Sequence, residues 1–75
     1  MEIEEVIATN VRRLRNARKW TQEALAEKAH LSSRYVGAIE RANVSARVGI
    51  IGRIADAFGV EPADLLKRSK PRTRG

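Results

Sequence analysis

Apolar residues recur every three or four positions along most of this chain, and that spacing constrains its fold more than any other feature. Strand-like alternation of apolar and polar residues is absent, so the pattern favours helices. The apolar stripes of the first and fourth helical segments are Ile3, Ile7, Val11 and Leu14, and Val48, Ile51, Ile54, Ala55 and Phe58. The sequence predicts an all-α domain of five short helices around one core.

Two residues with short oxygen-bearing side chains mark the starts of the second and third helices. Thr21 precedes residues 22–29, whose apolar residues have helical spacing, and Ser32 precedes a similar segment at residues 33–41. Hydroxyl groups at such positions accept hydrogen bonds from the free amides of a first helical turn. We therefore expect two short helices separated by a tight turn.

The fourth helix is expected to follow a loop at residues 42–45, with Ser45 as its candidate cap. Gly59 would end this helix. Pro62 fits the first turn of a short fifth helix, where its missing amide hydrogen costs nothing, and the two leucines that follow would dock that helix on the core.

Positive charge is concentrated at the C-terminal end of the chain. The net charge is +6, and five cations stand in residues 67–75 without an acid: Lys67, Arg68, Lys70, Arg72 and Arg74. Residues 1–66 are left with a net charge of about +1. We expect a folded domain at residues 1–66 and a basic, disordered tail at residues 67–75, which either solubilises the domain or acts as a DNA arm.

Several classes of function are disfavoured by what the chain lacks. It has no cysteine and a single histidine, His30, so one chain offers no disulfide and no zinc site of cysteines or histidines. No apolar stretch is long enough to span a membrane, and the first residues are acidic where a secretory signal is basic. No acid–base cluster or glycine-rich phosphate loop is present. We expect a cytoplasmic, nucleoid-associated protein that is not an enzyme and has no metal, cofactor or membrane contact.

Residues 21–41 carry the functional prediction. Two short helices joined by a tight turn cross steeply, so the first turn of the second can enter a DNA major groove. Ser33 and Arg34 are the polar residues there, and arginine suits bidentate hydrogen bonding to guanine. Thr21 and Gln22, at the start of the preceding helix, suit a phosphate contact.

Several short motifs agree with this interpretation. They are Thr21-Gln22 with Leu25-Ala26, Leu31-Ser32, Ile39-Glu40-Arg41, Arg53-Ile54-Ala55, Gly59-Val60 and Leu65-Leu66. In this order they resemble the helix-turn-helix of the phage Cro and cI repressor type, the xenobiotic-response-element (XRE) family, over about residues 7–66. The resemblance implies a lambda-repressor-like DNA-binding domain with its helix-turn-helix at helices two and three.

The resemblance also implies which side chains face the bases of DNA. Ser33, Arg34 and Ala38 occupy the positions whose side chains reach base edges. Gly37 and Ala38 make the middle of this helix bare, so Arg34 would carry more of the specificity, with contact from Ala38 to a thymine methyl.

The remaining implied roles are phosphate contacts and one structural ion pair. Gln22 and Arg41 match positions that contact DNA phosphate in the family. Tyr35 either reaches a phosphate or packs at the helix flank. Arg15 and Glu40 match a buried ion pair that links the first helix to the third.

The sequence departs from the family at three glycine positions. His30 stands at the turn glycine, Ala42 two residues after the conserved glutamate, and Lys19 where a glycine often ends the first helix. A left-handed conformation at such a residue costs roughly 1 kcal/mol when it is not glycine.

Two further features leave alternatives open. The arginines of the first helix are either a solvated face or phosphate contacts; they are Arg12, Arg13, Arg15 and Arg18. Gly49 and Gly52 lie inside the fourth helix, either by drift on an exposed face or because a second protomer approaches closely there.

The sequence as a whole predicts a transcriptional regulator that binds double-stranded DNA, with repression as the default. A homodimer would place two recognition helices about 34 Å apart and favour a pseudo-palindromic operator. The alternatives are a restriction–modification controller protein, an antitoxin with a toxin partner, and a protein of this fold that binds another regulator instead of DNA.

Overall fold

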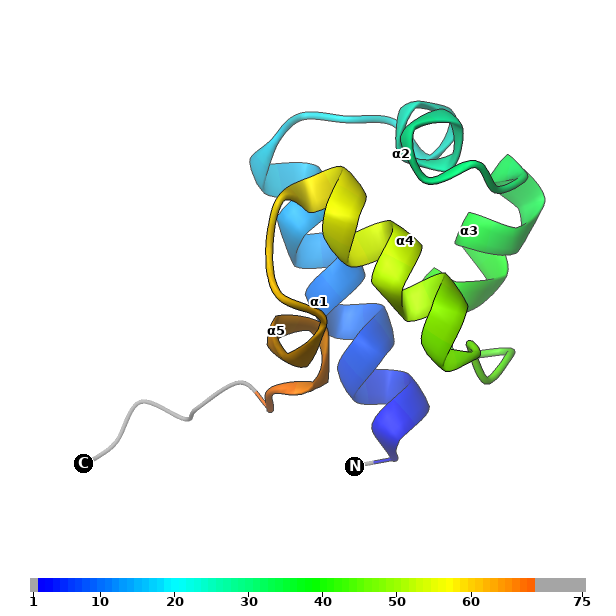
Figure 1. The fold of residues 1–75 in the computed structure, drawn as a ribbon. Helices are drawn as coiled ribbons and strands as arrows, with labels where there is room; N and C mark the ends of the chain where they lie inside the picture. The colour runs from blue at the N-terminus through cyan, green and yellow to red at the C-terminus, as the bar shows by residue number, and fades with distance from the viewer. Residues whose placement is uncertain (1, 69–75) are drawn as a thin grey trace.

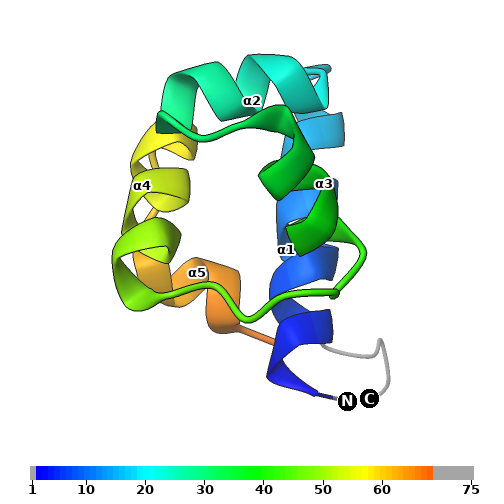
Figure 2. The same ribbon diagram turned by 90° about the vertical axis from the view of Figure 1, so that its right-hand side faces the viewer.

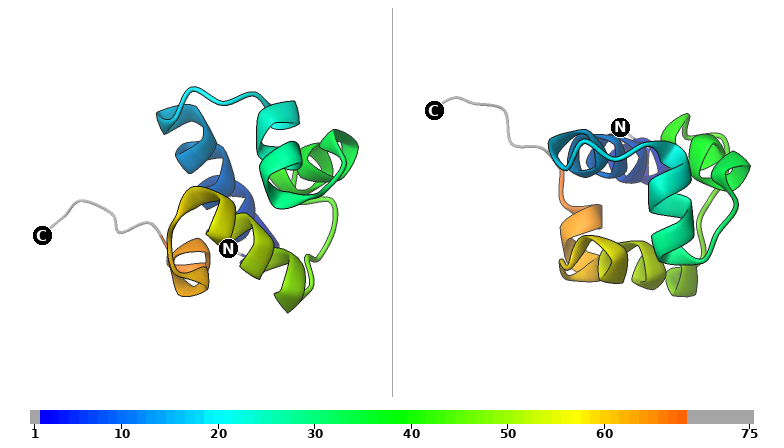
Figure 3. Two further views of the ribbon diagram at one scale, coloured as in Figure 1. Left: turned by 45° about the horizontal axis from the view of Figure 1, so that its top comes forward. Right: turned by 90° about the horizontal axis from the view of Figure 1, so that it is seen from above.

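The computed structural model describes residues 2–68, which form five helices and no strand. The helices are α1 (Ile3–Ala17), α2 (Gln22–Ala29), α3 (Ser33–Glu40), α4 (Val48–Phe58) and α5 (Pro62–Leu66). Seen from above, α1 and α4 form two opposite sides, α2 crosses at one end and α5 closes the other (Figure 3). The five-helix prediction is confirmed. The part of the predicted tail after residue 68 lies outside the described residues. Within residues 2–68, no helix is long and apolar enough to cross a membrane.

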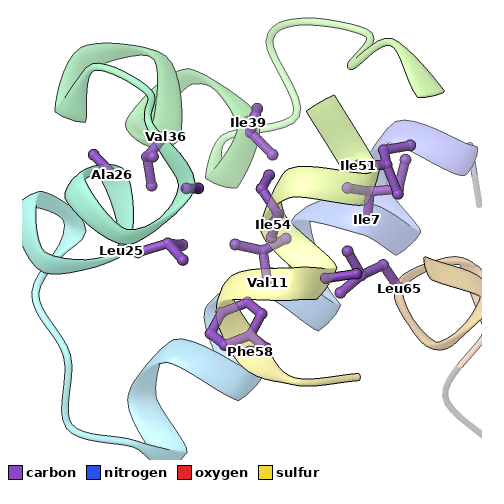
Figure 4. Packing of buried hydrophobic residues seen from close by; sticks show 12 residues of the cluster. Ile7, Val11, Leu25, Ala26, Val36, Ile39, Ile51, Ile54, Phe58 and Leu65 are labelled. Atoms are coloured by element: carbon purple, nitrogen blue, oxygen red, sulfur yellow. The ribbon is translucent and has the colours of Figure 1, made fainter. Parts of the chain in front are cut away.

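The core lies inside this frame and draws on all five helices (Figure 4). Its most deeply buried side chains, each 0% exposed, are Val11, Leu25, Val36, Ile54, Ala55 and Leu65. Three residues predicted to be buried or docked are instead exposed: Ile3 by 45%, Val48 by 85% and Leu66 by 42%. Ile3 and Val48 are the first residues of their helices, and at these positions the apolar stripe extends beyond the core. Leu66 is the last residue of α5, so of the two leucines only Leu65 packs into the core.

The two predicted N-caps of α2 and α3 are present. Thr21 Oγ1 accepts a hydrogen bond from the Ala24 amide at 3.0 Å, and Ser32 Oγ accepts one from the Tyr35 amide at 3.1 Å. Each hydroxyl satisfies one of the amides that a helix start leaves unpaired. These caps fix where the two helices begin, and therefore where the turn between them lies.

The predicted cap of α4 is wrong. The residue before this helix is Arg47, which makes no side-chain capping bond. The hydroxyl of Ser45 donates instead to Glu4 Oε2, at 2.6 Å. The partner lies 41 positions away in the sequence, so no local pattern reveals it. This bond ties the loop before α4 to the first turn of α1.

Four helices end in the same way. At the end of each of α1 to α4, a residue in the left-handed region bonds its amide to the carbonyl three positions back, and the next amide reaches five positions back. The left-handed residues are Lys19 (φ 59°), His30 (φ 60°), Ala42 (φ 58°) and Gly59 (φ 73°). This is the Schellman motif, in which glycine is favoured because it has no Cβ. The three positions where the family has glycine thus do adopt a left-handed conformation, and three of these four helix ends bear strain.

The arginines of α1 hold the other helices in place. Arg12 Nη1 donates to the Glu40 carbonyl at the end of α3, at 2.8 Å. Arg18 Nη2 donates to the Phe58 carbonyl at the end of α4, at 2.6 Å. Cations are favourable at these ends because the last carbonyls of a helix are unpaired and carry partial negative charge. Neither interpretation of these arginines from the sequence included this role.

One buried amide anchors α5. Asn10 on α1 is 2% exposed, and its Nδ2 donates to the carbonyls of Leu65 at 2.7 Å and Lys67 at 2.8 Å. Arg13 completes the arrangement by donating to Asn10 Oδ1 at 3.2 Å. A five-residue helix is too short to be stable alone, so these bonds and the burial of Leu65 define its position.

Candidate nucleic-acid interface

The helices α2 and α3 project together from one end of the molecule (Figure 1). They lie across one another, with α3 on the outer side of α1 (Figure 2). Ala26 is 3% exposed and lies beside Val36, so a small side chain stands where the two helices meet (Figure 4). This arrangement gives α3 one face toward the core and one face toward solvent.

An ion pair fixes the far end of α3 to α1. Arg15 Nε lies 2.6 Å from Glu40 Oε2, and Arg15 Nη2 donates to Glu40 Oε1 at 3.0 Å. The two side chains are only 16% and 4% exposed. The hydrogen bond to Glu40 raises the pKa of Arg15 above its usual value, which is already high. The pair that the resemblance implies is therefore part of the structure, in the bidentate geometry typical of strong arginine–carboxylate pairs.

The same carboxylate holds the start of α2. Gln22 Nε2 donates to Glu40 Oε1 at 3.1 Å. Glu40 thus links α1, α2 and α3 through two side-chain partners. The amide of Gln22 keeps a second N–H that this bond does not use.

The side chains expected to read bases lie on the first turns of α3. Ser33 and Ala38 are half-buried, and Arg34 is exposed. Arg34 has no hydrogen bond or ion pair with any other residue between 2 and 68. Its guanidinium is therefore available to a ligand.

The side chains expected to contact phosphate differ in their availability. The Thr21 hydroxyl is engaged as an acceptor in the α2 cap, and Gln22 is oriented by Glu40. Tyr35 is half-buried against the core cluster, which agrees with packing at the helix flank. Arg41 is exposed, follows the last residue of α3 and has no side-chain partner among the described residues.

Few positive side chains of the domain are free. Among the residues that the structure describes, four lysines and arginines have side chains without a hydrogen bond, ion pair or ring contact: Lys19, Arg34, Arg41 and Arg47. Three of these four belong to α3 or to the loop that follows it. Arg47 was not singled out from the sequence, and it stands directly before α4 as its N-cap residue. The available positive charge is therefore concentrated around α3, although the domain is almost neutral overall.

The residues between 2 and 68 hold no group of three side chains suited to a metal ion. What this end of the molecule offers is a projecting helix, free guanidinium groups, and amide and hydroxyl side chains. These are the groups that proteins use to bind phosphates and base edges.

The sequence profile of the helix-turn-helix family matches residues 11–65. The chain belongs to the helix-turn-helix family. The match covers α2 and α3 and continues into α5, in agreement with the XRE-type resemblance. It confirms the family and the fold that the sequence predicted.

Relatives of this helix-turn-helix protein include regulators. Control protein C.SmaI of Serratia marcescens is 35% identical over 68 residues, which are 91% of this chain and 81% of that protein. The structure of the hypothetical transcription factor NHTF from Neisseria superimposes with a TM-score of 0.86 at 34% identity, over 89% of this chain and 77% of that one. The restriction–modification controller protein C.AhdI from Aeromonas hydrophila gives a TM-score of 0.80 at 32% identity, over 83% and 94% of the two chains.

Proposed function

We propose that this protein is a transcriptional repressor that binds a pseudo-palindromic DNA operator as a homodimer. The observation that carries the proposal is the set of free guanidinium groups on α3 and on the loop that follows it, namely Arg34, Arg41 and Arg47. DNA phosphates attract such groups, and binding them releases counterions. A cytoplasmic, nucleoid-associated location follows from this role.

In this proposal the first turns of α3 enter the major groove. Arg34 donates two hydrogen bonds to a guanine, Ser33 contacts a neighbouring base, and Ala38 touches a thymine methyl. The exposure of Arg34 and its lack of an internal partner support this assignment, since no existing bond has to break.

Phosphate contacts would then fix the register of α3 in the groove. Gln22 and Thr21 lie at the start of α2, and Arg41 lies beyond the end of α3. Tyr35 is a further candidate on the flank of α3. Contacts on both sides of a recognition helix orient it without adding sequence preference.

The homodimer is proposed because the described residues contain one such projecting helix. Two copies related by a two-fold axis would read two half-sites about one helical turn apart. The exposed face of α4 is a candidate contact surface: Val48 is 85% exposed, and nothing lies within 4 Å of a Cβ built on Gly49 or Gly52. If a second protomer packs there, Gly49→Ala and Gly52→Ala will weaken dimerisation; if not, both will only stabilise the fold.

A second candidate is a controller of a restriction–modification system. This candidate is favoured by the similarity to C.SmaI and C.AhdI; the structural match covers 94% of the C.AhdI chain. Such a protein would bind DNA through the same residues and differ in its target genes. Restriction and methyltransferase genes beside the gene of this protein would decide for the controller.

The test is selection of bound duplexes from a random DNA pool at near-physiological salt. We expect enrichment of a pseudo-palindrome with half-sites about 10 base pairs apart. Arg34→Ala should lose roughly 1–3 kcal/mol of binding free energy and relax the preference at one base position of each half-site. Arg13→Ala is the matched control, because Arg13 is engaged with Asn10 on α1 and should not alter the preference. A pool without any enriched sequence would refute the proposal and favour a protein partner, either a toxin or another regulator.

A further inference from the structure

Gly37 is a buried glycine in the middle of α3, and the side chain of Gln22 from α2 lies beside it. Glycine in a helix interior is unfavourable relative to alanine, because it loses more backbone freedom on folding. Its φ is not in the left-handed region, so the backbone conformation does not require it. The reason for a glycine must lie in what surrounds it.

The space beside Gly37 is occupied by two side chains. A Cβ built on this residue would lie 3.1 Å from Arg41 Nη1 and 3.4 Å from Gln22 Oε1. Arg41 stands one helical turn further along, so its guanidinium folds back over the glycine. Gln22 reaches the same place from the first turn of α2. The missing methyl group therefore leaves room for both groups over the same residue.

The two side chains are not held equally firmly. Gln22 is fixed by its bond to Glu40, and Glu40 is fixed by Arg15. The guanidinium of Arg41 has no hydrogen bond or ion pair among the residues described, and it lies in the free space over Gly37. Added bulk at Gly37 would displace Arg41 first, because its far end is flexible and its neighbours are not.

We infer that Gly37 is a positioning residue, which brings the guanidinium of Arg41 beside the amide of Gln22 so that both bind one DNA phosphate. The inference rests on the proposed DNA binding. Gln22 would donate its remaining N–H and Arg41 a charge-assisted hydrogen bond. A phosphate held from α2 and from the end of α3 at once would fix both helices on the backbone, which neither contact achieves alone.

The test is Gly37→Ala, measured by fluorescence anisotropy on a labelled duplex of the selected sequence and on a scrambled one. We expect the Kd for both duplexes to rise about tenfold and the slope of log K against log salt to become shallower by about 1, as for the loss of one phosphate contact. The melting temperature should stay the same or rise, because alanine favours the helix. A merely structural glycine would change stability and leave the salt slope as it was.

Arg13→Ala is the matched control, since Arg13 is engaged with Asn10 on the side of α1 that holds α5. It should leave the Kd per protomer and the salt slope unchanged under conditions where the oligomeric state is held constant. A control that shows the same shallower slope would overturn the inference.

A double-mutant cycle with Arg41→Ala decides the case even if Gly37→Ala weakens the fold. In the Arg41→Ala background, the guanidinium that lies 3.1 Å from a Cβ on Gly37 is absent. Gly37→Ala then has no guanidinium to displace, so it should cost no further affinity for DNA. Equal losses in both backgrounds would refute the positioning role. If wild-type protein binds neither duplex in a salt-dependent way, the proposed function itself fails; if it binds both and Gly37→Ala binds equally well, only this inference fails.

Discussion

Replacing the three strained residues at helix ends by glycine should stabilise the protein. Lys19, His30 and Ala42 have φ values of 59°, 60° and 58°, and each ends a helix in a Schellman motif. This conformation costs an L-residue roughly 1–2 kcal/mol. Glycine removes that cost but makes the unfolded chain more flexible, which returns roughly 0.4–1 kcal/mol. The net gain is about 0.5–1 kcal/mol for each position.

The three gains should add, because the positions lie at three different helix ends and share no hydrogen bond. The triple variant is then more stable by about 1.5–3 kcal/mol, which raises the Tm of a domain this size by roughly 6–24 °C. Circular dichroism melts of the wild type, the single variants and the triple variant measure this directly. A triple variant that melts at or below the wild-type temperature would refute the reasoning.

Two glycines of α4 and its end provide an internal control for this experiment. Gly59 has a φ of 73°, so Gly59→Ala should lower the stability by about 1–2 kcal/mol. Gly52 is helical with open space around it, so Gly52→Ala should raise the stability by up to about 1 kcal/mol. The same substitution, glycine to alanine, should thus lower the stability at one position and raise it at the other.

Three further predictions concern the polar contacts. Asn10→Ala leaves two carbonyls at the end of α5 without their donor and should cost about 1–3 kcal/mol of unfolding free energy, measured by urea denaturation. Arg15→Leu leaves the charge of the buried Glu40 without its cationic partner and should cost about 3–5 kcal/mol of unfolding free energy. Arg15→Leu combined with Glu40→Leu should recover most of this loss, and a double variant no more stable than the single one would contradict it. The hydrogen bond from Ser45 lowers the pKa of Glu4. The bond therefore stabilises the fold above the usual carboxyl pKa, and this stabilisation is lost as the pH falls through the lowered pKa of Glu4. Ser45→Ala should raise the pKa of Glu4 in an NMR titration, and an unchanged pKa would contradict the bond.

The sequence predicted those parts of the fold that depend on local signals. The helix starts at Thr21 and Ser32 followed from a hydroxyl beside a free amide, and the three left-handed residues other than Gly59 lie where a known family has glycine. The ion pair of Arg15 and Glu40 was reached only through the resemblance, since the two residues are 25 positions apart. Local chemistry and family patterns therefore sufficed for the architecture.

What the sequence could not show was which polar groups meet across the fold. Arg12 and Arg18 find carbonyls 28 and 40 positions away, and Ser45 finds Glu4 instead of capping α4. A backbone carbonyl has no residue type, so no sequence pattern marks it as a partner. The free cations around α3 became visible only once these internal partners were known, because availability is a property of the folded molecule.

The stacking of Trp20 has a practical consequence. Its ring lies 5.5 Å from that of Phe58 in nearly parallel planes, and Lys28 and Arg18 lie over it at 4.9 and 5.6 Å from its centre. It is the single tryptophan of the chain, so all indole emission originates where the loop after α1 meets α2 and α4. Separation of these elements would expose the ring to water and shift its emission to longer wavelength. The domain therefore carries an intrinsic fluorophore through which its opening can be followed in real time, without a label and without altering α3.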